Sequence, residues 1–427
     1  MFGFRTLWSE DTSTRLDAET RTRKTFRLDL MRGVFRGILT AGTQTFGLFI
    51  AIRVFQAGDM SKALIGSAPF MGMLVSLLLV HYASQTGFRK SVWGALPAAV
   101  CGVLLLAAAF ANSLATYTVC LVLAFMALTS LVPFLTSIYN DNYPEDRRGL
   151  FFSRSVMALV LVSVVTGFAG SALMDVDLDN YRWILVTLGL AALGKACVVY
   201  AMPSNILENG EHKNPLGNLR LVFQDRNFGY VLLTWFIMGF ANLWTLPLRV
   251  DYITSSKYGI EGSALFVALI ITVIPDLMRA LSTPFLARLF DKMNFIVLRM
   301  ILNLLFAIGV GLFFLTKDPY LIATASAFIG MAFGGGAIAW SLWVTKYAPP
   351  GKVAAYMSVH VGLTGVRGTI GPMLGFWMVN QVGPVNIGLI SFAMMILATV
   401  MLIPEIKHGK RKRGPIPAED FEPIEPK

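Results

Sequence analysis

Long apolar stretches alternate with short polar ones along almost the whole chain. A helix that crosses a membrane needs about 20 mostly apolar residues. Because lipid offers no hydrogen bonds and these stretches are continuous rather than alternating, they predict an all-α polytopic membrane protein and not a β-barrel. We identify twelve such stretches, at about residues 31–54, 62–83, 92–112, 115–139, 153–174, 183–203, 228–249, 263–287, 296–316, 320–344, 355–379 and 384–404.

The composition agrees with this pattern. Hydrophobic residues make up 55% of the 427 residues and charged residues only 14%, where an ordinary globular chain has about 25% charged. The three cysteines form no CxxC pair, which excludes a disulfide framework and a cysteine zinc site. The four histidines are scattered, which argues against a histidine metal site. We therefore predict no metal and no cofactor.

Basic residues are distributed unevenly between the two sides of the predicted spans. Of the 36 Lys and Arg, 25 fall in the N-terminal segment, the even-numbered loops and the C-terminal tail, and only four in the odd-numbered loops. This count assigns Arg32 to the N-terminal segment and Arg299 to the loop before the ninth span. The positive-inside rule then predicts cytoplasmic termini. It also explains the net charge of +11 without nucleic acid as a partner.

The two halves of the chain show a weak internal repeat. Pro69 of the second span and Pro275 of the eighth lie 206 residues apart, and similar polar loops follow both spans. Such a repeat is common in transporters. We predict five regions: a cytoplasmic N-terminal segment (1–30), a six-helix bundle (31–203), a cytoplasmic connector (204–227), a second six-helix bundle (228–406) and a basic, then disordered, tail (407–427).

Short motifs follow the second and eighth spans. Gly87, Arg89 and Lys90 occur after the second, and Asp291 with Lys292 after the eighth. With twelve spans in two halves, this resembles the major facilitator superfamily, whose signature at this point combines Asp, Gly and basic residues. The resemblance covers about residues 30–405, although Ser84 and Asn294 depart from the signature. It implies two pseudo-symmetric six-helix bundles and a cytoplasmic gate, for which the candidates are Gly87, Arg89, Arg147, Arg148, Asp291 and Lys292.

Charges inside apolar stretches are the main candidates for function, because burying a charge in a membrane is costly. Asp276 lies near the middle of the eighth span, and Arg279 follows on the same helix face. We interpret the pair as a proton or cation coupling site, with a structural ion pair as the alternative. His360, on the eleventh span, is a further coupling candidate because its pKa lies near neutral pH, or else a packing residue.

Six residues are candidates for binding a solute. Arg367 is suited to an anionic group or to neutralising Asp276, while Arg53 and Arg249 end matching spans and either flank a cavity or reach the outer headgroups. Polar and aromatic side chains on the first and seventh spans would contact a polar solute or join helices. These are Gln44, Asn242 and Trp244.

These observations predict a secondary active transporter that moves a small solute by alternating access. Positive charge dominates inside the spans, which favours an organic anion, and Asp276 suggests a proton as coupling ion. No Walker A motif is present, so ATP is not expected to drive transport. We expect a monomer in a bacterial plasma membrane, since no N-x-[ST] sequon marks a eukaryotic secretory route. Alternatives are an efflux pump for hydrophobic compounds, a polytopic membrane enzyme and a non-transporting receptor.

Overall fold

Every regular element of the described structure is a helix. The computed structural model describes residue 12 and residues 16–144, 147–206, 217–348 and 353–407. The first half of the chain forms α2 (Ala18–Ala41), α3 (Gly47–Arg53), α4 (Asp59–Thr86), α5 (Lys90–Ala109), α6 (Leu114–Ser130), α7 (Val132–Asn142), α8 (Arg148–Val176) and α9 (Tyr181–Tyr200). The second half forms α10 (Leu221–Gln224), α11 (Arg226–Thr254), α12 (Ala264–Ala268), α13 (Ile274–Lys292), α14 (Phe295–Leu315), α15 (Pro319–Leu342) and α16 (Val353–Met401).

The first membrane helix starts earlier than the apolar pattern indicates. Asp17 caps α2 by accepting a hydrogen bond from the backbone N–H of Thr20 at 3.0 Å, which satisfies a donor that the helix start leaves free. The polar residues from Ala18 onward are therefore helical. A π-helical segment, Gly42–Phe46, joins α2 to α3.

Ten helical stretches of the described residues are long and apolar enough to cross a membrane. One of them, Tyr356–Lys407, has 52 residues and contains α16. Gly383 has a φ of 80° there, so α16 consists of two helices that turn back at this glycine. The protein is therefore an all-α, multi-pass membrane protein, whereas the exact count of twelve spans stays a prediction.

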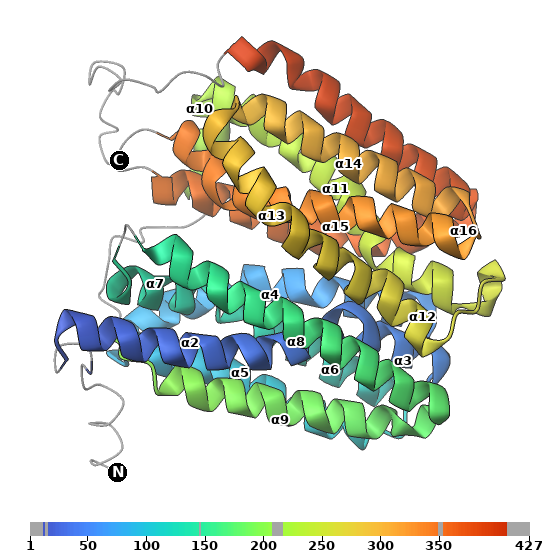
Figure 1. Cartoon of the computed structure of the whole chain (residues 1–427), viewed down its shortest axis with the longest axis horizontal. Helices are drawn as coiled ribbons and strands as arrows, with labels where there is room; N and C mark the ends of the chain where they lie inside the picture. Colours follow the sequence, from blue (N-terminus) through green and yellow to red (C-terminus); the bar gives the residue numbers. More distant parts are fainter. Residues whose placement is uncertain (1–11, 13–15, 145–146, 207–216, 349–352, 408–427) are drawn as a thin grey trace.

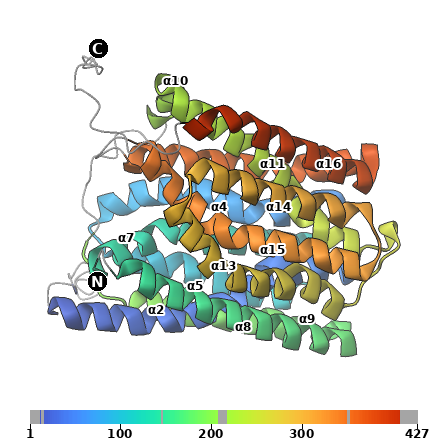
Figure 2. The ribbon, with the colours of Figure 1, turned by 45° about the horizontal axis from the view of Figure 1, so that its top comes forward.

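The two halves of the chain form two groups of helices (Figure 1). They meet near α3 and α12, and their ribbons diverge toward the end where α2 begins and α16 ends. We call the end formed by α3, α12 and Ser256–Tyr258 the distal end. Both views place α13 between α8 of the first half and α15 of the second (Figures 1 and 2), and α13 contacts both helices.

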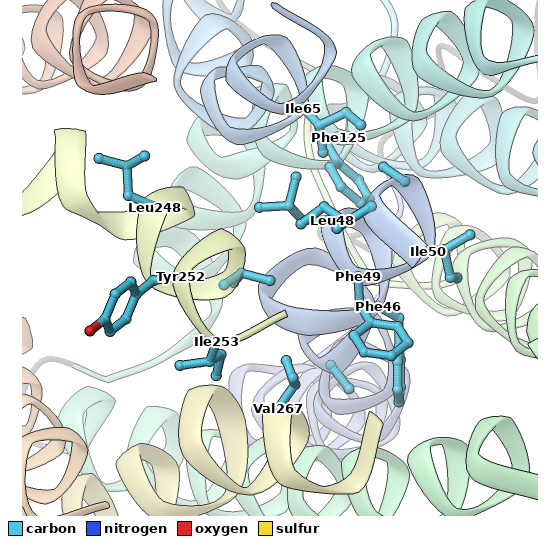
Figure 3. Packing of buried hydrophobic residues seen from close by; sticks show 14 of the residues in the cluster. Phe46, Leu48, Phe49, Ile50, Ile65, Phe125, Leu248, Tyr252, Ile253 and Val267 are labelled. Carbon is cyan, nitrogen blue, oxygen red and sulfur yellow. The ribbon is translucent and has the colours of Figure 1, made fainter. Parts of the chain in front are cut away.

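Apolar side chains from both halves pack together toward the distal end. Phe46, Leu48 and Ile65 of the first half belong to the same buried cluster as Leu248 and Ile253 of the second (Figure 3). Moving apolar surface from water into the protein stabilises the folded state by about 25 cal/mol per Å². Surface that would otherwise face lipid contributes less, because lipid is itself apolar. This packing holds the halves together at that end.

Candidate functional site

Asp276 lies where the two halves meet. Its side chain is buried, and its Oδ1 lies 2.9 Å from Arg279 Nη2 on the next turn of α13. Ser163 Oγ of α8, in the other half, donates to Asp276 Oδ2 at 2.9 Å. The predicted shared face of Asp276 and Arg279 is therefore present, and the carboxylate also joins the halves.

A second contact joins the halves close to Asp276. The helix that leads into α13 is π-helical over Leu269–Val273, like Gly42–Phe46 in the first half. Thr45 and Thr272, one from each segment, are fully buried and form a hydroxyl–hydroxyl hydrogen bond of 2.6 Å. π-Helical turns are frequent at functional sites. Gln44, the residue that we selected from the sequence, is only half-buried, and its neighbour Thr45 makes the contact.

Ion pairs reinforce the distal end. Lys62 Nζ of α4 lies 2.8 Å from Asp251 Oδ1 of α11, and both side chains are buried. Asp59 lies 3.3 Å from Lys62 Nζ and accepts from Asn380 Nδ2 at 2.7 Å. The sequence analysis counted Lys62 in a loop and did not include Asp251 among the candidate site residues. The local sequence at the edge of a span does not show which distant residue a charge will pair with.

The two arginines that end matching spans have different surroundings. Arg53 Nη1 donates to Glu261 Oε1 of the other half at 3.0 Å and is partly exposed. Arg249 is only 6% exposed, so it does not reach the lipid headgroups, and its Nε has no hydrogen-bond partner among the described residues. A solute-binding role for either arginine stays a prediction.

The two candidates on α11 also differ. Trp244 Nε1 donates to Ser391 Oγ of α16 at 2.7 Å, and Gly371 and Gly375 leave room for its backbone. This indole therefore joins helices within the second half. Asn242 is 8% exposed, and its Oδ1 has no partner in the part of the chain that the structure describes, which leaves an acceptor for a ligand.

Arg367 and His360 lie inside the second half. Arg367 Nη1 donates to the backbone carbonyl of Trp235, and its Nη2 donates to Thr364 Oγ1 at 3.1 Å. A side chain at Gly239 would overlap the guanidinium, so glycine creates the space for it. Arg367 forms no ion pair with Asp276, whose partners are Arg279 and Ser163.

His360 is 1% exposed and is surrounded by indole rings. Its ring centroid lies 5.2 Å from that of Trp235, 5.2 Å from that of Trp340 and 5.3 Å from that of Trp343. These contacts resemble the packing alternative more than a proton relay, which would need polar neighbours. Its role in coupling stays untested.

Two arginines that the sequence analysis counted outside the spans, Arg32 and Arg299, are buried inside helices. Arg299 is 3% exposed inside α14, where its guanidinium carbon lies 3.5 Å from the ring centroid of Trp235. Arg32 is 2% exposed in α2, and its Nε donates to Asp29 Oδ1 at 2.6 Å. Tyr139 donates to the same oxygen at 2.6 Å. Asp29 belongs to the polar segment before residue 31, and only the early start of α2 brings it into the bundle.

The candidates for the gate after α4 make contacts within the first half. Gly87 ends α4 with a φ of 68°, a conformation that favours glycine. Arg89 is buried, donates to Thr12 Oγ1 at 3.2 Å and lies over the Tyr200 ring. Lys90 Nζ lies 2.6 Å from Asp141.

The remaining gate candidates are less informative. Arg147 and Lys292 are exposed. The side chains of Arg148 and Asp291 and the whole basic tail after Lys407 lie outside the described residues. The predicted gate stays untested.

Comparison with known proteins identifies the family. A family model described as the Major Facilitator Superfamily matches residues 33–366 and 277–425. The chain belongs to the Major Facilitator Superfamily. It is thus a transporter of solutes and not an enzyme. The match confirms the resemblance to this superfamily that the sequence motifs indicated. It does not resolve the subfamily.

Solved structures of this superfamily share the fold. A POT family transporter in complex with a thioalcohol-conjugated peptide has a TM-score of 0.72 at 12% identity, covering 90% of this chain and 96% of that one. A D-xylose–proton symporter gives 0.70 at 14% identity, covering 91% and 98%. The nucleoside transporter NupG gives 0.66 at 12% identity, covering 92% and 100%. At such identities the likeness shows the fold alone, and no curated protein matches the sequence.

Proposed function

We propose that this superfamily member is a proton-coupled secondary transporter that moves a small organic anion by alternating access. Asp276 carries the proposal. It is a buried acid in the middle of a span, bonded to Arg279 in its own helix and to Ser163 in the opposite half. An acid at this depth is costly to keep charged without partners, and its bond to Ser163 lies between surfaces that separate when the halves move.

Protonation of Asp276 would alter both contacts at once. The neutral acid loses the attraction of Arg279, and one of its oxygens becomes a hydrogen-bond donor. The bond from Ser163 is then weaker, because a neutral acid is a poorer acceptor than a carboxylate, and this changes the free energy of the contact between the halves. A proton and the conformational equilibrium are coupled in this way.

The charges around this contact favour an anionic solute. Arg36 of α2 is exposed although it lies within the first span, and the side chain of Arg279 is 24% exposed. An anion is attracted to such accessible positive charges within the spans. The unpartnered Oδ1 of Asn242 on α11 would accept from a hydroxyl or N–H group of such a solute, not from its negative charge.

The orientation follows from the basic residues. Leaving out the buried basic residues, which are Arg32, Arg89, Lys90 and Arg299 on the side of the termini and Lys62 on the other, gives 21 against three. We therefore propose that the termini are cytoplasmic, in a bacterial inner membrane, and that the distal end faces outward. One chain supplies both halves of the pathway, so we propose that the monomer transports.

Transport by Asp276→Asn in proteoliposomes tests the coupling. We expect uptake driven by a pH gradient to fall at least about tenfold, whereas exchange of the same solute across the membrane without a gradient persists. The reason is that an amide keeps hydrogen bonds but cannot take up the proton. The solute is first found by counterflow with a panel of anionic, neutral and cationic compounds.

The control is Asp179→Asn, which removes an exposed carboxylate near the distal end. This variant should accumulate solute like the unmodified protein. Full pH-driven accumulation by Asp276→Asn would refute the coupling role. A panel in which only hydrophobic cations move would favour the efflux alternative, and the absence of any flux would favour a receptor.

A further inference from the structure

Three guanidinium groups of the second half, those of Arg249, Arg299 and Arg367, are buried without a carboxylate partner among the described residues, and two of them contact Trp235. Arg299 is 3% exposed and Arg367 is 5% exposed. In the part of the chain that the structure describes, neither forms an ion pair, and their neighbours are aromatic rings, a thioether, a hydroxyl and a backbone carbonyl. A buried charge normally needs a counter-charge, because its hydration is lost.

Trp235 brings these groups together. Its backbone carbonyl accepts from Arg367, one face of its ring contacts Arg299 at 3.5 Å, and its ring meets His360 in an edge contact at 5.2 Å. Trp343 stacks on Trp235 with the ring centroids 5.5 Å apart. Two guanidinium groups, a second indole and an imidazole therefore meet at Trp235.

Several N–H donors in this region lack an acceptor. Trp235 Nε1, Trp343 Nε1 and Arg367 Nε are buried and form no hydrogen bond with any residue that the structure describes. All three residues are at least nine-tenths buried. An unmade hydrogen bond at a buried donor costs about 1–3 kcal/mol, more if the group is charged. A desolvated cation–π contact stabilises a buried cation by about 2 kcal/mol or more. The contact with Trp235 stabilises Arg299 in this way, but it provides no hydrogen-bond acceptor for the N–H groups of Trp235, Trp343 and Arg367.

A negative charge beside Trp235 would offset part of the two positive charges and would accept hydrogen bonds from the free N–H groups that face it. The guanidinium of Arg367 itself fills the space that a methyl group at Gly239 would need. Such close packing suits a monatomic ion better than an organic anion.

The location argues for a resident ion and against the transported solute. Arg299, Arg367, Trp235 and Trp343 all belong to the second half and are buried within it. A solute that crosses by alternating access has to contact the surface between the halves, where Asp276 and Thr45 lie. We propose that the second half contains a buried binding site for one chloride-sized inorganic anion, formed by Arg299, Arg367, Trp235 and Trp343.

Thermal unfolding of the purified full-length protein in detergent tests this site without reference to transport. Chloride would replace gluconate at constant ionic strength, and the unfolding midpoint Tm would be followed. A ligand that binds only the folded state raises Tm in a saturable way, and we expect a rise of about 2 °C or more. Bromide, added in the same way, should quench tryptophan fluorescence with a similar midpoint concentration, because two indoles line the site.

Arg299→Gln and Arg367→Gln should each abolish the chloride response, while Arg182→Gln, which removes an exposed arginine of α9, should keep it. If a glutamine variant does not fold, Trp343→Phe keeps both arginines and removes one donor, and its midpoint chloride concentration should rise about 3- to 10-fold. Identical Tm and fluorescence of the unmodified protein in chloride and gluconate would overturn the proposal. A response that survives in both glutamine variants would do the same. Neither result bears on Asp276, because no proton-driven uptake is measured.

Discussion

The two halves bury arginines in opposite ways. In the first half, Arg32 donates to the carboxylate of Asp29, and Tyr139 donates to the same carboxylate. In the second half, Arg299 lies over the face of Trp235, and Arg367 donates to a backbone carbonyl and a threonine. The first arrangement is electrically neutral, and the second has an excess of positive charge.

The difference shows what a buried arginine requires. A carboxylate neutralises a guanidinium completely, so that Arg32 needs no further counter-charge. Aromatic faces and carbonyls offset only part of the desolvation cost. The site of Arg32 and the site of Arg299 and Arg367 therefore differ in whether an outside counter-charge is needed, and three substitutions test this difference.

Removing the carboxylate of the first half should have the largest effect. Asp29→Ala leaves the buried Arg32 without its counter-charge, and breaking a buried pair in this way costs about 3–5 kcal/mol. The free energy of unfolding, measured by SDS titration in mixed micelles, should fall by this amount. The double variant Asp29→Leu with Arg32→Met should recover most of the loss. A decrease below about 1 kcal/mol would contradict a structural role for the pair.

Removing the hydroxyl that supports the carboxylate should have an intermediate effect. Tyr139→Phe deletes a hydrogen bond to a charged acceptor, worth about 1.5–3 kcal/mol. Tyr117→Phe is the matched control, because it deletes a buried hydrogen bond of 2.9 Å to the neutral carbonyl of Gly47 and should cost about 0.5–1.5 kcal/mol. The same unfolding titration compares them. Equal losses would mean that the charge of Asp29 does not strengthen the bond.

Removing an arginine of the second half should have the smallest effect. Arg299→Met replaces an uncompensated cation with an apolar chain of similar length, and in chloride-free buffer stability should change by less than about 1 kcal/mol or increase. Arg32→Met, measured in parallel, should be strongly destabilising because it leaves the buried carboxylate of Asp29 without its counter-charge. Similar losses for both variants would show that aromatic rings compensate Arg299 as well as a carboxylate compensates Arg32.

Some of the site was predictable because it depends on neighbours in one helix. The pair of Asp276 and Arg279 follows from a spacing of three residues, and the structure has it. Contacts across the bundle were not predictable. Ser163 and Thr272 look like ordinary polar residues of apolar stretches, yet they join the halves.

Assignments at the ends of spans were the least reliable. A basic residue near a span boundary has the same local sequence context whether it faces water or the bundle. Arg32 was therefore counted in the N-terminal segment and Arg299 in a loop, although both are buried. The cap at Asp17 was a local signal that would have extended the first helix, and with it Asp29 would have become an intramembrane acid.

The sequence by itself determined that this protein is a helical membrane transporter with two related halves. The length of an apolar stretch and the distribution of basic residues are local properties, and the membrane acts on each stretch almost independently. Only the tertiary structure decided which charge has which partner. That depends on the rotation of each helix about its axis and on residues far away in the chain, as for Lys62 with Asp251.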